Sequence, residues 1–137
     1  MTTMLKWLKS LRKTEKGQST VEMALVLPIV ILLLFGIMEF GRIFNAYLII
    51  TNAAREGARA GVVGASDAAI RSAATATAGT LDTVAMSVYI TPASYLRVRG
   101  ASLTVEIEYP VRVFTPVINN FTGDPFVVNA RTTMRVE

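Results

Sequence analysis

The spacing of apolar residues divides this chain into a long apolar run, a segment of small residues and several alternating stretches. Residues 23–38 form a run of sixteen uncharged residues, and apolar side chains continue to Ile50, interrupted by Glu39 and Arg42. At 1.5 Å per residue, a helix over the whole window exceeds the ~30 Å hydrocarbon core of a bilayer. The pattern therefore predicts a transmembrane helix over about residues 21–45.

The segment after Ile50 is rich in small residues and predicts that the same helix continues beyond the membrane. Ala53, Gly57 and Gly61 recur at four-residue spacing, which lets helix backbones approach one another closely. Glycine inside a helix costs about 1 kcal/mol relative to alanine, so the two glycines indicate that packing needs them. We expect one helix over residues 18–63, in which Ala53, Gly57 and Gly61 form a packing face.

The rest of the chain, residues 64–137, predicts a small extracytoplasmic α+β domain. Ser66 is a suitable N-cap for a short second helix over residues 67–78, with Asp67 favourably placed in its first turn. Apolar and polar residues then alternate with a period of two in three stretches, residues 86–91, 103–109 and 126–136. They predict about three antiparallel strands with one polar face. The other face needs cover, for which the extramembrane half of the long helix is the nearest candidate.

The net charge of +4 lies entirely in the first 17 residues, which hold five Lys or Arg and one Glu. The remaining 120 residues carry nine Arg against nine Asp or Glu, so no basic surface for nucleic acid is expected. A basic block before an apolar run places residues 1–17 in the cytoplasm and the body of the chain outside it. A cleaved secretory signal is the rival interpretation, but the apolar run is longer than usual and no small-x-small site follows it.

The composition argues against an enzyme. The chain has no Cys and no His, which excludes thiol and imidazole catalysis and the usual zinc sites. The acids after residue 50 show no catalytic clustering along the sequence, and we expect no cofactor, metal or small-molecule substrate. Glu39 and Arg42 are three residues apart on one helical face, where they can form an intramembrane ion pair.

Glu22 is the most informative charge, because an acid at the mouth of a transmembrane helix is costly. It is the fifth residue after Gly17, the glycine that ends the basic block and precedes Gln18. This arrangement resembles the processing site of type IV pilin-like precursors. In those proteins a membrane-embedded prepilin peptidase cuts after the glycine, and the fifth mature residue is Glu.

Further stretches resemble the TadE-like pseudopilins of the tight adherence (Tad, or Flp) pilus system. They are residues 17–28, 41–42, 52–62, 109–111 and 130–137. Met23 departs from the pattern, since many members have an aromatic residue there. The resemblance implies a minor pilin-like subunit of an adhesive pilus, held in the bacterial inner membrane after cleavage between Gly17 and Gln18. It also implies that Glu22 pairs with the new amine of an adjacent pilin-like subunit and sets the register.

Two other interpretations stay open. The chain could be an unprocessed single-pass anchor that presents a periplasmic binding domain, or a minor subunit of another type IV-like secretion machine. Genes for a secretion ATPase and a prepilin peptidase beside this one would separate these interpretations. If the pilus interpretation holds, the expected partners are the peptidase, other pilin-like subunits, the assembly platform and the inner membrane.

Overall fold

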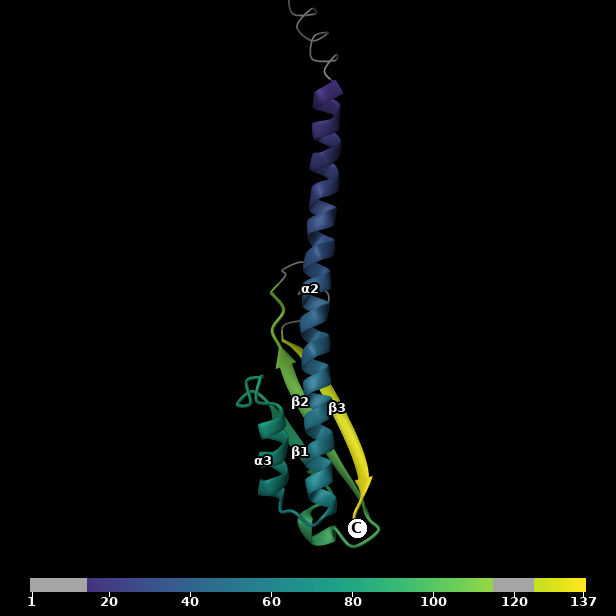
Figure 1. The fold of residues 1–137 in the computed structure, drawn as a ribbon, viewed down its shortest axis with the longest axis vertical. Coiled ribbons are helices and arrows are strands. Elements are labelled where there is room, and N and C mark those ends of the chain that lie inside the picture. Colours follow the sequence, from purple (N-terminus) through teal and green to yellow (C-terminus); the bar gives the residue numbers. More distant parts are fainter. Residues whose placement is uncertain (1–14, 115–124) are drawn as a thin grey trace, which may run out of the picture. The chain divides into compact units, whose positions relative to one another are not determined.

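The computed structural model describes residues 15–114 and 125–137. Most of the predicted leader, residues 1–17, thus lies outside the described residues. The elements, in chain order, are α2 (Glu15–Val62), α3 (Asp67–Thr77), β1 (Ser87–Thr91), the 3-10 helix η1 (Ser94–Leu96), β2 (Ser102–Val111) and β3 (Phe126–Arg135) (Figure 1). The predicted α+β class is confirmed, with a long N-terminal apolar helix, a short second helix and an antiparallel sheet of three strands.

The chain divides into two compact units, Met1–Ile37 and Met38–Glu137. In the described part of the first unit, the leucine, isoleucine and valine side chains of α2 are all exposed, with Met23 70% and Leu25 69% exposed. So much apolar surface is not stable in water, because burying it would contribute about 25 cal/mol per Å². The helix is long and apolar enough to cross a membrane, which indicates a membrane anchor.

The sheet of the second unit has the strand order β1-β2-β3, with both pairs antiparallel. On β2, Leu103, Val105 and Ile107 are fully buried, whereas the intervening Thr104 and Glu106 are partly exposed. The predicted alternation is therefore confirmed, and one face of the sheet is polar. Thr104 and Thr133 are register partners on that polar face, and their hydroxyl groups are hydrogen-bonded at 2.8 Å.

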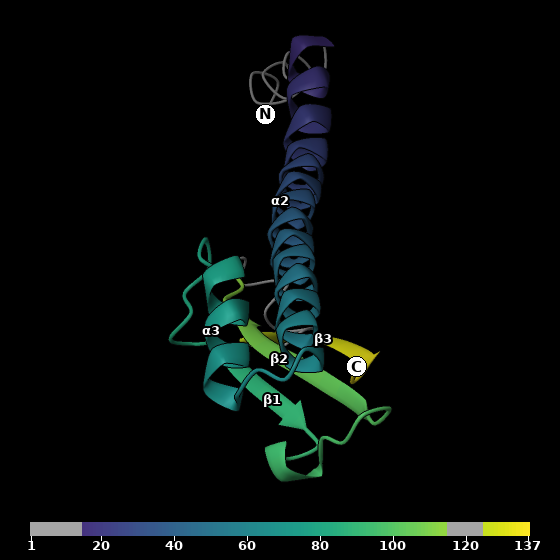
Figure 2. The ribbon, with the colours of Figure 1, turned by 60° about the horizontal axis from the view of Figure 1, so that its bottom comes forward.

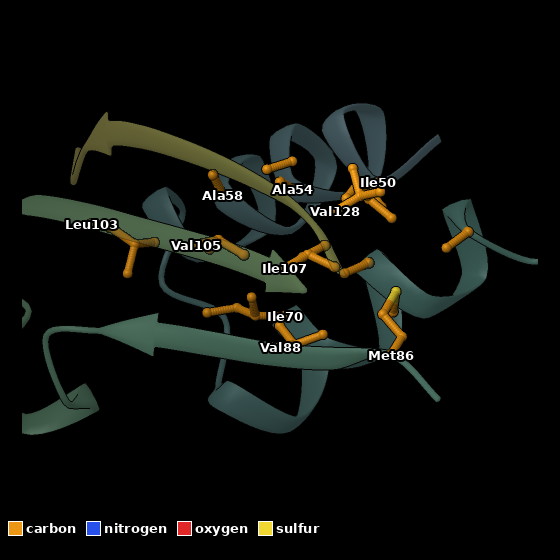
Figure 3. Packing of buried hydrophobic residues seen from close by; sticks show 14 of the residues in the cluster. Ile50, Ala54, Ala58, Ile70, Met86, Val88, Leu103, Val105, Ile107 and Val128 are labelled. Carbon is orange, nitrogen blue, oxygen red and sulfur yellow. The ribbon is translucent and has the colours of Figure 1, made fainter. Parts of the chain in front are cut away.

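The apolar face of the sheet packs against α2 and α3 (Figures 2 and 3). Ile50 of α2 and Ile70 of α3 are fully buried in this core, as is Ile107 of β2. The expectation that the long helix covers the sheet is thus confirmed, and α3 shares that role. Part of the apolar character after Met38, at Ala46 and Ile50, therefore serves the core of the domain. Whether the membrane span extends to residue 45 stays a prediction.

Both helices have ends that their local sequence explains. Gly64 has a backbone φ of +91°, a conformation that residues with a side chain rarely adopt. This conformation allows a Schellman motif at the end of α2. In it, the N–H of Gly64 donates to the carbonyl of Gly61, and the N–H of Ala65 donates to the carbonyl of Ala60. The N–H of Glu137 donates to the carbonyl of Val62 at 3.1 Å. The α2 helix ends at Val62, one residue earlier than predicted. At α3, the Ser66 hydroxyl accepts from the N–H of Ala69, so the predicted N-cap is confirmed.

Candidate functional site

The residues of the predicted processing site lie together on exposed helix. Gly17, Gln18 and Glu22 all belong to α2 and are exposed. A Cβ atom added at Gly17 would meet no heavy atom within 4 Å. Residues four apart on a helix lie on the same face one turn from each other, so Gln18 and Glu22 are neighbours. An amine created at Gln18 would start within reach of the carboxylate of its own chain and would be exposed on the helix surface.

Glu39 is a buried charged residue, with 5% of its surface exposed. Its Oε1 accepts a hydrogen bond from the backbone N–H of Phe114 at 2.7 Å, and its Oε2 lies 3.2 Å from Nη1 of Arg42. The structure therefore brings together the two residues that the sequence suggested as an ion pair. Arg42 also places its guanidinium carbon 4.3 Å from the centroid of the Phe114 ring, within the range of a cation–π contact.

These three residues, which we call the Glu39 clip, hold the segment after β2 against α2. Sequence reasoning missed Phe114, which is 75 residues from Glu39. No spacing rule connects residues that far apart, and the bond uses a backbone N–H, which every residue but proline has. The available signal was weak: an aromatic residue a few positions after Pro110, at the end of an alternating stretch.

We expect Glu39→Ala to free the Phe114 N–H from the clip. A hydrogen bond to a charged group contributes about 1.5–3 kcal/mol, so exchange of the Phe114 amide should accelerate by roughly ten- to a hundredfold. Hydrogen exchange of the full chain in detergent, read at the Phe114 amide, measures this. Arg42→Gln serves as the matched control, since it leaves the Phe114 acceptor in place and should have a smaller effect. Unchanged protection in Glu39→Ala would contradict the role of the clip.

The small residues of the predicted packing face lie against the chain's own domain. Ala53 is fully buried, and a Cβ atom at Gly57 would lie 3.4 Å from Cβ of Ala74 on α3. At Gly61, a Cβ atom would lie only 2.2 Å from Cδ2 of Leu103 on β2. Gly57 therefore allows α2 and α3 to approach closely, and Gly61 makes room for the sheet. The structure places all three residues within the domain rather than on its surface.

Within residues 15–114 and 125–137, no group of three or more acidic, cysteine or histidine side chains could hold a metal ion. Asp67 at the start of α3 is paired with Arg97, which also donates to the carbonyl of Pro92 at 3.0 Å. This pair ties α3 to the segment after β1, so its role is structural.

Residues 17–59 match the family model described as TadE-like protein. The resemblance found in the sequence is therefore confirmed over this segment, which is TadE-like. The match begins at Gly17, includes Glu22 and the Glu39–Arg42 pair, and ends within the small-residue part of α2. No curated protein and no solved structure was found to match the chain.

Proposed function

We propose that this chain, which is TadE-like over residues 17–59, is a precursor that a prepilin peptidase converts into a structural, non-catalytic subunit of a Tad-type adhesive pilus. The family implies a minor pilin-like role associated with the Tad pilus. One observation carries the proposal of processing: the match begins at Gly17, the residue after which the cut is proposed, and includes Glu22 five positions later.

Cleavage would hydrolyse the peptide bond between Gly17 and Gln18, leaving a carboxylate on Gly17 and an α-amine on Gln18. One feature of the structure and one of the sequence support this step. Gly17 has no side chain and open space around it, so a peptidase can approach its backbone closely. The basic leader also ends there, and basic residues favour the cytoplasmic side, where the peptidases of type IV pilin-like precursors act.

The sequence predicts a membrane span over about residues 21–45, but Ala46 and Ile50 serve the core of a compact unit that begins at Met38. For the mature chain we therefore propose a span from Gln18 to Met38. Its 21 residues extend about 31 Å as a helix, which matches a hydrocarbon core of ~30 Å. The compact unit that contains the sheet begins at Met38. We place this unit outside the cytoplasm, where it would contact other pilin-like subunits and the assembly platform.

Co-expression with a matching prepilin peptidase should remove residues 1–17 and leave a chain of 120 residues. Gly17→Leu should block this, because a branched side chain prevents the close approach that glycine allows. Gly41→Leu is the matched control, since Gly41 also lies in open space on α2 and is far from the cut. Intact-mass analysis of the membrane-extracted protein measures the outcome.

Three other results of this experiment would reject parts of the proposal. A full-length mass in the presence of an active peptidase would favour the unprocessed membrane anchor and reject processing. A cut after Arg42 would indicate a secretory signal instead. Correct cleavage without any association with pilus components would reject the Tad pilus and favour another type IV-like machine.

A further inference from the structure

The two edges of the sheet are protected differently. At β1, the strand is only five residues long, α3 lies on that side of the sheet, and Arg71 of α3 donates a hydrogen bond to the carbonyl of Val88 (Figures 1 and 2). At the other edge, β3 is ten residues long and contains no proline. Within residues 15–114 and 125–137, no strand pairs with β3 on the side away from β2. Alternate residues of such an edge present unpaired N–H and C=O groups.

An apolar groove of about 270 Å³ lies along the first half of this edge. Its walls are Phe40, Ile43, Phe44 and Tyr47 of α2 and residues 126–129 of β3. The lining includes β3 residues of the apolar face, such as Val128, and of the polar face, such as Asn129, but among the described residues it includes none of β2. Because residues from both faces of β3 line the groove and no described residue of β2 does, the groove opens at the edge of β3 that faces away from β2.

The charges of the sheet indicate what this edge would accept. On the polar face, β3 presents Arg131 and Arg135, both exposed, and it carries no acid. On the paired side, Glu106 of β2 is the register partner of Arg131. The strand that β3 already pairs with therefore alternates apolar residues, which face the core, with polar ones, and its acid Glu106 lies opposite Arg131 while Ser102 lies opposite Arg135.

A second copy of this chain does not fit the free edge. Pairing β3 with β3 of another copy would bring four arginines and no acid onto the two adjoining strands. Like charges on neighbouring strands destabilise a sheet. The edge of β1 fits no better, because α3 and Arg71 lie there.

We propose that the free edge of β3 binds an extended segment of another protein in which apolar and acidic residues alternate. The segment would add a fourth strand to the sheet. Its backbone would pair with β3, its apolar side chains would enter the groove beside Phe44 and Tyr47, and its acids would lie beside Arg131 and Arg135. In strand addition the main chain supplies the affinity and alternate side chains supply the specificity. The surface belongs to the folded domain, so this inference is independent of processing and of the pilus.

The test uses the full chain in detergent and a labelled octapeptide that alternates valine and glutamate. Fluorescence anisotropy should show binding at least about tenfold tighter than for the same peptide with lysine in place of glutamate. The variant R131Q/R135Q should bind the glutamate peptide about tenfold more weakly. The matched control R55Q/R59Q removes the same charge from exposed positions on α2 and should bind as the unchanged chain does. On binding, amides of β3 should become protected from hydrogen exchange.

Four outcomes would overturn the proposal. One is the absence of binding at millimolar peptide. A second is equal affinity for a peptide of the same composition with its valines and glutamates in two blocks. A third is equal affinity for a peptide that is N-methylated at every residue, because such a peptide has no backbone N–H group to donate along a strand edge. The fourth is protection of the groove residues by lipid vesicles but not by the peptide, which would make lipid the occupant.

Discussion

Gly61→Val should destabilise the Met38–Glu137 unit by about 3 kcal/mol or more. Gly61 lies in the last turn of α2, and even a single Cβ atom there would lie 2.2 Å from Cδ2 of Leu103 and 2.9 Å from Cδ1 of Ile70. Both of those side chains are fully buried, so neither can move without displacing other core residues. Protein interiors are close-packed and accommodate such insertions poorly. A valine adds two further methyl groups to this clash.

Hydrogen exchange of the β2 amides in the full chain measures this loss, since about 1.4 kcal/mol corresponds to a tenfold change in an equilibrium constant. The slowest amides should exchange more than a hundredfold faster in Gly61→Val. Gly57→Ala is the matched control. Its Cβ atom would lie 3.4 Å from Cβ of Ala74, an ordinary contact, and alanine gains up to about 1 kcal/mol of helix propensity. Equal exchange in the two variants would show that the contact at Gly61 relaxes at little cost.

Glu22→Gln should weaken association with other pilin-like subunits at least about tenfold while leaving cleavage intact. If the mature chain begins at Gln18, its new α-amine lies near the edge of the hydrocarbon core and Glu22 lies one helical turn further in. An unpaired carboxylate costs about 2.5–3.5 kcal/mol at the centre of a membrane helix on insertion scales, and less near the end of the helix, where Glu22 would lie. Pairing with the amine of an adjacent subunit offsets that cost and fixes the axial register between two apolar helices. Glutamine keeps the shape of the side chain but removes the charge.

Quantitative co-purification from cells that make pili provides the measurement, and recovery of partner subunits should fall at least about tenfold. Glu56→Gln is the control, because Glu56 is an exposed acid on the same helix within the second compact unit. A Glu22→Gln protein that is cleaved, recovers its partners and supports normal piliation would show that Glu22 pairs only with its own chain or with lipid headgroups. Failure of cleavage in Glu22→Gln would assign the residue to peptidase recognition instead.

The elements of this fold could be predicted from local sequence, because each is determined by neighbours within a few residues. The alternation of Leu103, Val105 and Ile107 predicts a half-buried strand, and the three residues are fully buried in the structure. Ser66 predicts the start of α3, since capping needs only the hydroxyl and an N–H three residues away. The fifth-residue relation between Gly17 and Glu22 is likewise a matter of short spacing, and the TadE-like match covers it.

The position of the small residues shows the limit of such reasoning. The four-residue spacing of Ala53, Gly57 and Gly61 indicated a close packing face, but not what packs against it. A neighbouring subunit, a membrane helix and the chain's own domain all favour the same residue types. The tertiary structure places α3 at Gly57 and β2 at Gly61. Which partner packs against these small residues depends on how residues 64–137 fold back along the helix.

By itself, the sequence determined the apolar helix and the strands with their faces, because the periodicity of apolar residues acts over a few positions. Only the tertiary structure decided what depends on distant pairing. It joined Glu39 to the backbone of Phe114, set Arg131 opposite Glu106, and left one edge of β3 without a partner strand among the described residues. A buried carboxylate can accept any N–H group that the fold brings to it, and a strand edge is free or paired according to the order of strands. Neither the partner of a buried carboxylate nor the pairing of a strand edge can be predicted from the spacing of residues along the chain.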